Sequence, residues 1–190
     1  MESLHDFALQ SNKKFKLNFD GGDLSSDAGL LLIKEFASKI GFENLVKASF
    51  KTNDTALFRL HTDPENLLQM LYQTIAAYHR DDCADELTQE PIMTAVLGKD
   101  SLASQPTLSR FFSRMDEDTL LQMQQILRRM RRTIYALDTP EHILLDLDST
   151  LLDTYGSQEG EAFNYHYQAH GYHPLLCFDG LTGDLLKAQL

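Results

Sequence analysis

The chain has 190 residues, a formal net charge of −11 and an apolar content of 43%, which suit a globular protein of one domain or two small ones and exclude a disordered chain. Its apolar runs are too short to span a membrane, its first residues do not resemble a signal peptide, and its two cysteines indicate no disulfide framework, so we expect a cytoplasmic protein. The acidic charge counts against a sequence-independent nucleic-acid binder, because Lys and Arg are needed to neutralise phosphates.

The first 62 residues are predicted to contain one strand and one helix. Residues 1–12 are polar and expected to be loose, and the alternation over 13–19 predicts a short strand. Ser25 or Ser26 can cap a helix that ends at Gly41. Its inward stripe is expected to contain Leu30, Ile33, Phe36 and Ala37.

Five further helical segments are predicted before residue 138. Asp63-Pro64-Glu65 has the cap, proline and acid typical of a helix start. The helix that follows is expected to bury Leu67, Leu68, Leu71, Tyr72 and Ile75. The next segments span about 83–89, 91–97 (ending at Gly98), 105–115, and a long helix from Asp116 or Asp118 to Leu137. The long helix is expected to face inward with Leu120, Met123, Leu127, Met130 and Ile134.

At Asp138-Thr139-Pro140 the pattern changes from helical period to strand period, and we place a domain boundary there, between 1–138 and 139–190. Strands are predicted over 142–148, 172–178 and 185–190, with a turn at 179–184 and an irregular segment at 151–171. The predicted fold class is α+β, a helical N-terminal region followed by antiparallel strands.

The first of these strands carries the most informative residues. Its alternation points Asp146 and Asp148 to the same side, and its apolar residues predict a buried strand. Buried carboxylates are costly unless they bind a metal ion or a cation. We expect the hydroxyls of Ser149 and Thr150 to fix the last aspartate. The alternative is a strand end whose acids face water.

Two families share features with this strand. Asp146-x-Asp148 resembles the nucleophile motif of haloacid-dehalogenase-type phosphatases, in which the first Asp attacks phosphorus. That family needs alternating strands and helices after the motif, whereas a hairpin is predicted here, so the phosphatase is the alternative interpretation.

The second resemblance covers nearly the whole chain, and it is to the N-terminal portion of a DDE transposase of the insertion-sequence group called thirteen-eighty. The similar segments, in order, are Ser26-Asp27-Ala28-Gly29-Leu30, residues 76–98, residues 102–111, residues 145–150, residues 160–167 and residues 171–176. The resemblance implies an RNase H-like catalytic domain, with a catalytic Asp on the first of three antiparallel strands.

The resemblance also implies a site and a reaction. Asp148 would be the first catalytic acid and a ligand of Mg²⁺ or Mn²⁺, with Asp146 as its alternative or partner, in metal-dependent DNA strand cleavage and transfer. The family's later acids have no match in this sequence. We therefore expect a truncated, N-terminal portion that is inactive alone, and a non-catalytic DNA-binding remnant is left open.

Two groups of residues are predicted to contact DNA. The family resemblance implies that this DNA is the terminal inverted repeats of the element. Residues 91–97 and 105–115 read as a helix-turn-helix-like segment, with Gln105, Thr107, Ser109 and Arg110 near the start of its second helix. The alternative is an ordinary helix pair. The one basic cluster contains Arg128, Arg129, Arg131 and Arg132, which could form a phosphate track on the long helix, or a solvated face that pairs with acids. Whether the protein is a homo-oligomer is left open.

Overall fold

The computed structural model describes residues 7–18 and 27–190, and its contacts divide the chain into two compact units, Met1–Ile126 and Leu127–Leu190. The division falls inside the longest helix, whereas the sequence-based boundary follows that helix. The assignment of 1–138 and 139–190 as functional domains stays a prediction.

The described chain begins with two short strands, β1 (Phe7–Ala8) and β2 (Lys16–Leu17), which pair antiparallel. The expectation of a loose segment over 1–12 is therefore wrong at Phe7 and Ala8. The predicted strand over 13–19 is confirmed at Lys16–Leu17, and Phe19 lies outside the described residues.

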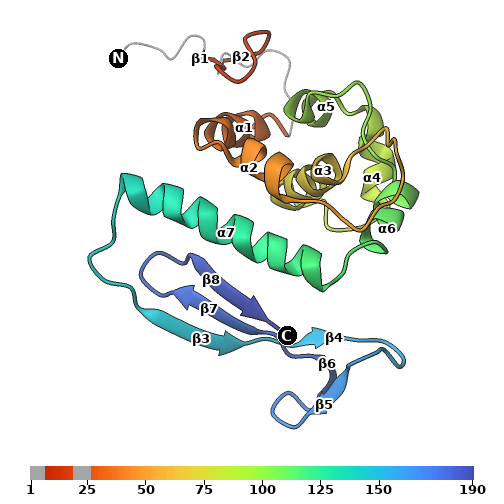
Figure 1. Cartoon of the computed structure of the whole chain (residues 1–190), viewed down its shortest axis with the longest axis vertical. Coiled ribbons are helices and arrows are strands. Elements are labelled where there is room, and N and C mark those ends of the chain that lie inside the picture. Colours follow the sequence, from red (N-terminus) through yellow and green to blue (C-terminus); the bar gives the residue numbers. More distant parts are fainter. Residues whose placement is uncertain (1–6, 19–26) are drawn as a thin grey trace. The chain divides into compact units, whose positions relative to one another are not determined.

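Figure 1 shows the helices of the described chain, which match the predicted segments except for the helix over Phe42–Ser49. They are α1 (Leu30–Lys39), α2 (Phe42–Ser49), α3 (Asp63–Ile75), α4 (Cys83–Glu86), the 3-10 helix η1 (Leu87–Gln89), α5 (Pro91–Leu97), α6 (Gln105–Phe112) and α7 (Glu117–Leu137). The predicted caps Ser25 and Ser26 lie outside the described residues. The sequence analysis missed α2, because Gly41, at φ +70°, both ends α1 and directly precedes α2.

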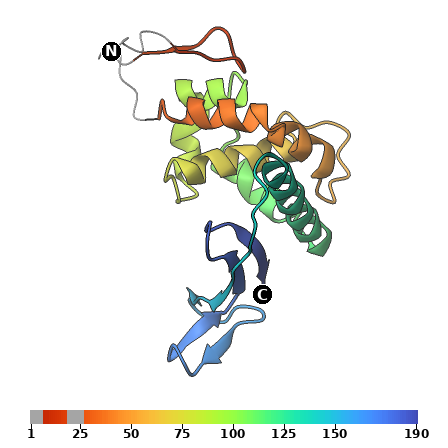
Figure 2. The ribbon, with the colours of Figure 1, turned by 90° about the vertical axis from the view of Figure 1, so that its left-hand side faces the viewer.

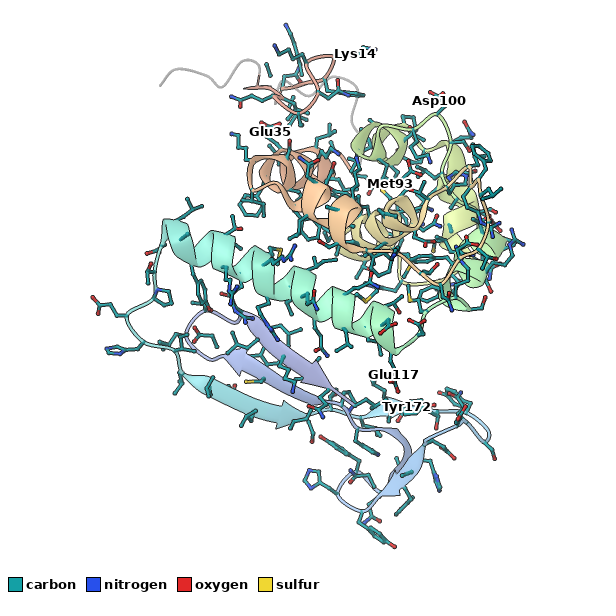
Figure 3. The ribbon with its side chains drawn as sticks, viewed as in Figure 1. Lys14, Glu35, Met93, Asp100, Glu117 and Tyr172 are labelled. Carbon is teal, nitrogen blue, oxygen red and sulfur yellow. The ribbon has the colours of Figure 1, made fainter. Side chains whose placement is uncertain are left out.

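The helical unit has a core built from several helices, with Met93 inside it (Figure 3). The predicted inward stripes are wrong in part. Ile33 and Phe36 of α1 are exposed, Phe36 by 55%, while Glu35 is buried and accepts a hydrogen bond from the Ser11 N–H at 2.8 Å. A polar side chain with a partner can thus occupy a position that periodicity assigns to an apolar one.

The helices α3 and α7 show the same departure from their predicted stripes. Leu71 and Ile75 of α3 and Leu120 of α7 are exposed, while Gln69 and Thr119 are buried. The Gln69 amide exchanges two hydrogen bonds with the backbone of Ala103, at 2.8 and 2.9 Å. This pairing lets an amide lie inside the helical unit.

The second unit contains two antiparallel three-stranded sheets (Figure 1 and Figure 2). Their strands are β3 (Leu145–Ser149), β4 (Leu152–Asp153), β5 (Ala162–Asn164), β6 (Ala169–Tyr172), β7 (Leu175–Asp179) and β8 (Leu185–Gln189). One sheet has the order β3-β7-β8 and the other β4-β6-β5. The α+β fold class and the predicted antiparallel sheet with its terminal hairpin are confirmed, although β3 begins at Leu145 and not at His142, and β7 begins at Leu175, since Tyr172 belongs to β6 of the other sheet.

The segment 151–171, predicted to be irregular, instead contains β4, β5 and most of β6. These strands have two to four residues, which is too short for an alternating pattern to be recognised. The phosphatase interpretation is not supported, because the partner of β3 is an antiparallel strand from a hairpin and not a parallel strand that follows a helix.

Candidate active site and nucleic-acid interface

The strand β3 places Asp146 and Asp148 on one face of its sheet. Asp146 lies opposite Phe178 and Asp148 lies opposite Leu176 in the register with β7. Because side chains alternate along a strand, Leu145 and Leu147 point to the other face. The two aspartates are therefore neighbours on one face, as predicted, and strand geometry places such neighbours about 7 Å apart at Cα.

The surroundings of these aspartates differ from the sequence-based expectation of a buried strand. Both aspartates are exposed, and Leu145 and Leu147 are each 62% exposed. The Oδ1 atom of Asp148 accepts a hydrogen bond from the backbone N–H of Ser149 at 2.8 Å, so a backbone group and not the expected hydroxyl orients this carboxylate. The exposed carboxylates are accessible to a metal ion or to a phosphate that carries one.

A third acid of this sheet, Asp179, has a structural role. It lies opposite Leu145, and hence on the face away from Asp146 and Asp148, and it is fully buried. Its Oδ1 atom accepts the N–H groups of Leu144 at 3.3 Å and Leu181 at 3.0 Å. Asp179 thereby joins the β7–β8 turn to the residue before β3. Among the described residues, no group of three or more His, Cys, Asp or Glu side chains could hold a metal ion.

The sequence analysis missed Tyr167, which supports the end of β3. Its hydroxyl donates a hydrogen bond to the Ser149 carbonyl at 2.8 Å, and its ring stacks on His173 with centroids 5.8 Å apart. The Thr150 N–H donates to the Pro174 carbonyl at 3.3 Å. Tyr167 and Pro174 belong to two of the segments that carry the family resemblance, which was the available signal for their importance.

The helix α6 carries the four residues predicted to contact DNA, and it ends at Phe112 and not at Met115. Ser109 and Arg110 are exposed, while Gln105 and Thr107 are half-buried. The side chains of Leu108 and Phe111 face the helical unit, where α6 packs against α3 and α4. The helix-turn-helix interpretation of α5 and α6 stays a prediction.

The arginines of α7 divide into two kinds. Arg128, Arg129 and Arg132 are exposed, as the phosphate-track interpretation requires. The expectation that Arg131 belongs to the same outer face is wrong, because Arg131 is half-buried and donates to the carbonyl groups of Leu185 at 3.4 Å and Leu186 at 3.3 Å, so it fixes the β7–β8 hairpin against α7.

One turn further along α7, Tyr135 lies beside the turn of the hairpin. Burial, and after it the neighbouring carboxylate of Asp184, raises the pKa of Tyr135, although the hydroxyl does not reach the geometry of a full hydrogen bond. Tyr135 therefore stays protonated and acts in packing.

Comparison with known proteins gives one family. The family model described as transposase DDE domain group 1 matches residues 7–190. The searches of curated proteins and of solved structures each found no match. In the described part of the chain, no helix is long and apolar enough to cross a membrane.

Proposed function

Because this chain belongs to the transposase DDE domain family, we propose that it acts in transposition by metal-dependent cleavage and transfer of DNA strands. The single observation that carries this proposal is the pair of exposed carboxylates, Asp146 and Asp148, on one face of β3 in a chain that matches the family over 7–190. We assign the chain to the thirteen-eighty group and its β3-β7-β8 sheet to the start of an RNase H-like domain.

Asp148 is proposed as the first catalytic acid and Asp146 as its partner. Carboxylate oxygens are the ligands that Mg²⁺ and Mn²⁺ prefer, and the exposed pair fits this requirement. The metal would supply charge neutralisation at the attacked phosphate and a more acidic bound water. The Ser149 N–H holds one oxygen of Asp148 in place, which leaves the other oxygen for the ligand.

The residues proposed to hold DNA lie on two helices. Gln105, Thr107, Ser109 and Arg110 of α6 would contact base edges and phosphates, and Arg128, Arg129 and Arg132 of α7 would contact phosphates. The substrate would be the terminal inverted repeats of the element. Exposure of the three arginines and of Ser109 and Arg110 supports this assignment.

We further propose that Asp146 and Asp148 are too few to complete a catalytic centre. Two-metal phosphoryl transfer needs several carboxylates that converge from different elements, and these two lie on one strand. The 190-residue chain assayed alone is therefore expected to cut DNA no faster than the background.

The test is strand cleavage of duplexes that carry the terminal repeats, with Mg²⁺ or Mn²⁺, for this chain and for any longer product of the same gene. In the cleaving protein, Asp148→Ala should lower the rate by about 100-fold or more, because a metal ligand is lost, while gel-shift affinity stays the same. Asp138→Ala, at an exposed acid outside β3, is the matched control. Normal cleavage by the Asp148→Ala variant would contradict the assignment.

A further inference from the structure

The helical unit contains a pocket of about 200 Å³ between α3 and α6. This volume is below the roughly 300–1,000 Å³ of pockets that take drug-sized ligands, so it suits a smaller group. Its lining residues are Met70, Gln73, Thr74, Tyr78, His79, Arg80, Asp81, Gln105, Leu108, Ser109 and Phe112. Two of the residues predicted to contact DNA, Gln105 and Ser109, thus line a cavity and not a flat helix surface.

The pocket has an apolar part made by Met70, Leu108 and Phe112. Leu108 is buried and fixed by the packing of α6, whereas Phe112 is partly exposed on the next turn of that helix. A thioether and an aromatic ring provide polarisable surfaces on which a flat ring can stack.

The polar part of the pocket contains an amide without a partner. Gln73 is 6% exposed, and in the described part of the chain its side-chain amide makes no hydrogen bond. The side chains of Gln105 and Ser109 also make none there. None of these three side chains is among the fully buried polar groups that lack a partner, so their polar atoms stay accessible to a ligand in the pocket.

The backbone beside the pocket is held in an uncommon conformation. Ala77 has φ +66° at the end of α3, a position where glycine is usual. The Tyr78 N–H donates to the Gln73 carbonyl at 2.9 Å, and the Tyr78 hydroxyl donates to Asp27 at 2.8 Å. These contacts hold the 78–81 segment at the pocket, with His79 and Arg80 exposed to solvent.

We propose that this pocket takes a single unpaired nucleobase of the DNA substrate, a proposal that rests on the proposed function. A primary amide offers both a donor and an acceptor, which is the pattern that base edges present. Gln73 and Gln105 would bind the edge of the base, and Met70 and Phe112 its flat face. A base out of the duplex fits because a base pair is too large for the cavity.

The test measures binding of the four deoxynucleoside monophosphates to the 190-residue chain by ligand-observed NMR. We expect a dissociation constant on the order of 1 mM for at least one of them. Gln73→Leu keeps the volume but removes the amide, and it should weaken binding about tenfold or more. Gln89→Leu, at an exposed glutamine outside the pocket, is the matched control.

A second variant keeps the test decisive if Gln73→Leu does not fold. Thr74→Phe, at an exposed position on the α3 side of the pocket, should fill the pocket and abolish nucleotide binding while the fold is retained. Unchanged affinity in the folded Thr74→Phe variant would overturn the proposal, as would saturation of the pocket by a peptide but by no nucleotide.

A duplex assay separates this proposal from the proposed function. A repeat duplex with a mismatched 2-aminopurine should gain fluorescence on binding to the chain, and Thr74→Phe, which changes no residue proposed to hold the duplex, should lose that gain but keep gel-shift affinity. Duplex binding without nucleotide binding would overturn the pocket assignment alone. Nucleotide binding without duplex binding would overturn the DNA-substrate assignment.

Discussion

At the scale of single residues, the most connected group in the helical unit is Arg114. Its guanidinium donates to Asp63 at 3.0 Å and to Thr52 at 3.2 Å, and it lies 3.5 Å from Asp54. Asp63 also accepts both the N–H and the hydroxyl of Thr52, each at 2.7 Å. One charged network thus holds together the start of α3, the loop before it, and Arg114, two residues after the end of α6.

This network predicts a loss of stability in acid. Hydrogen bonds from Arg59, and after them the Ala56 N–H, hold the pKa of Asp54 well below its usual value. Burial acts to raise the pKa of Asp63, but hydrogen bonds from Thr52 and Arg114 outweigh it, so that pKa is also lowered. Because the pKa values of Asp54 and Asp63 are lower in the folded chain than in the unfolded chain, their ionised forms stabilise the fold above the unfolded pKa, near 3.9. This stabilisation is lost as pH falls below about 4.

The measurement is urea unfolding of the chain between pH 2.5 and pH 6, where we expect the free energy of unfolding to fall on the acid side of about pH 4. Arg114→Met should flatten that fall and lower stability at pH 6 by about 1–3 kcal/mol, because Asp63 loses its cation. Arg110→Met, at an exposed arginine four residues earlier, should change stability by less than about 0.5 kcal/mol. Equal effects of the two variants would contradict the network.

At the scale of elements, the small sheet depends on Gly171. A Cβ atom there would lie 2.4 Å from the Leu152 carbonyl oxygen and 2.9 Å from the Leu151 Cδ1 atom. Gly171 pairs with Asp153 of β4 and Ala162 of β5, so it lies where all three strands meet. Since Tyr167, between β5 and β6, holds the end of β3, this close approach also helps to position the end of the strand that carries Asp148.

We therefore expect Gly171→Ala to destabilise the small sheet by about 1–3 kcal/mol, because backbone atoms must move apart. Hydrogen exchange of the amides in β4 and β6 should become faster. Gly29→Ala is the control, since its Cβ would meet nothing within 4 Å and its φ of −58° suits alanine. Unchanged exchange in Gly171→Ala would show that the strands do not need this contact.

Local chemistry explains which elements the sequence could predict. The proline and acid at Pro64 and Glu65 predicted where α3 begins to within one residue, since its cap is Thr62 and not Asp63, and Gly98 at φ +65° ends α5 as predicted. Strand alternation was sufficient to place Asp146 and Asp148 on one face.

The features that the sequence could not predict depend on distant residues. The short pairing of β4 with β6 depends on the packing at Gly171. The exposure of β3 depends on whether other elements cover its sheet, which the pattern of a single strand does not indicate. The burial of Asp179 depends on donors from Leu144, 35 residues away. The pocket could not be predicted, because Gln73 and Gln105 come together only through the packing of α3 on α6.

At the scale of the whole molecule, the net charge of −11 opposes binding to DNA, while the exposed arginines of α7 favour it. At physiological ionic strength charges are screened beyond about 8 Å, so a phosphate at Arg128 and Arg129 is influenced mainly by neighbouring groups. The local arginines are therefore expected to matter more than the overall charge. An acidic chain can then still bind DNA, with an affinity that depends strongly on salt.

A pair of charge-matched variants tests this expectation. Arg128→Ala/Arg129→Ala and Lys13→Ala/Lys14→Ala each remove two positive charges from exposed positions and so change the net charge equally, from −11 to −13. If the α7 arginines contact phosphates, the arginine variant should bind repeat duplexes more weakly and reduce the slope of log affinity against log salt by about 1.8, at about 0.9 per phosphate. The lysine variant should leave that slope unchanged, because Lys13 and Lys14 are not part of the proposed phosphate track and release no counterions there. Gel shifts between 50 and 200 mM salt decide the matter, and equal slopes for the two variants would show that α7 is a solvated face and not a phosphate track.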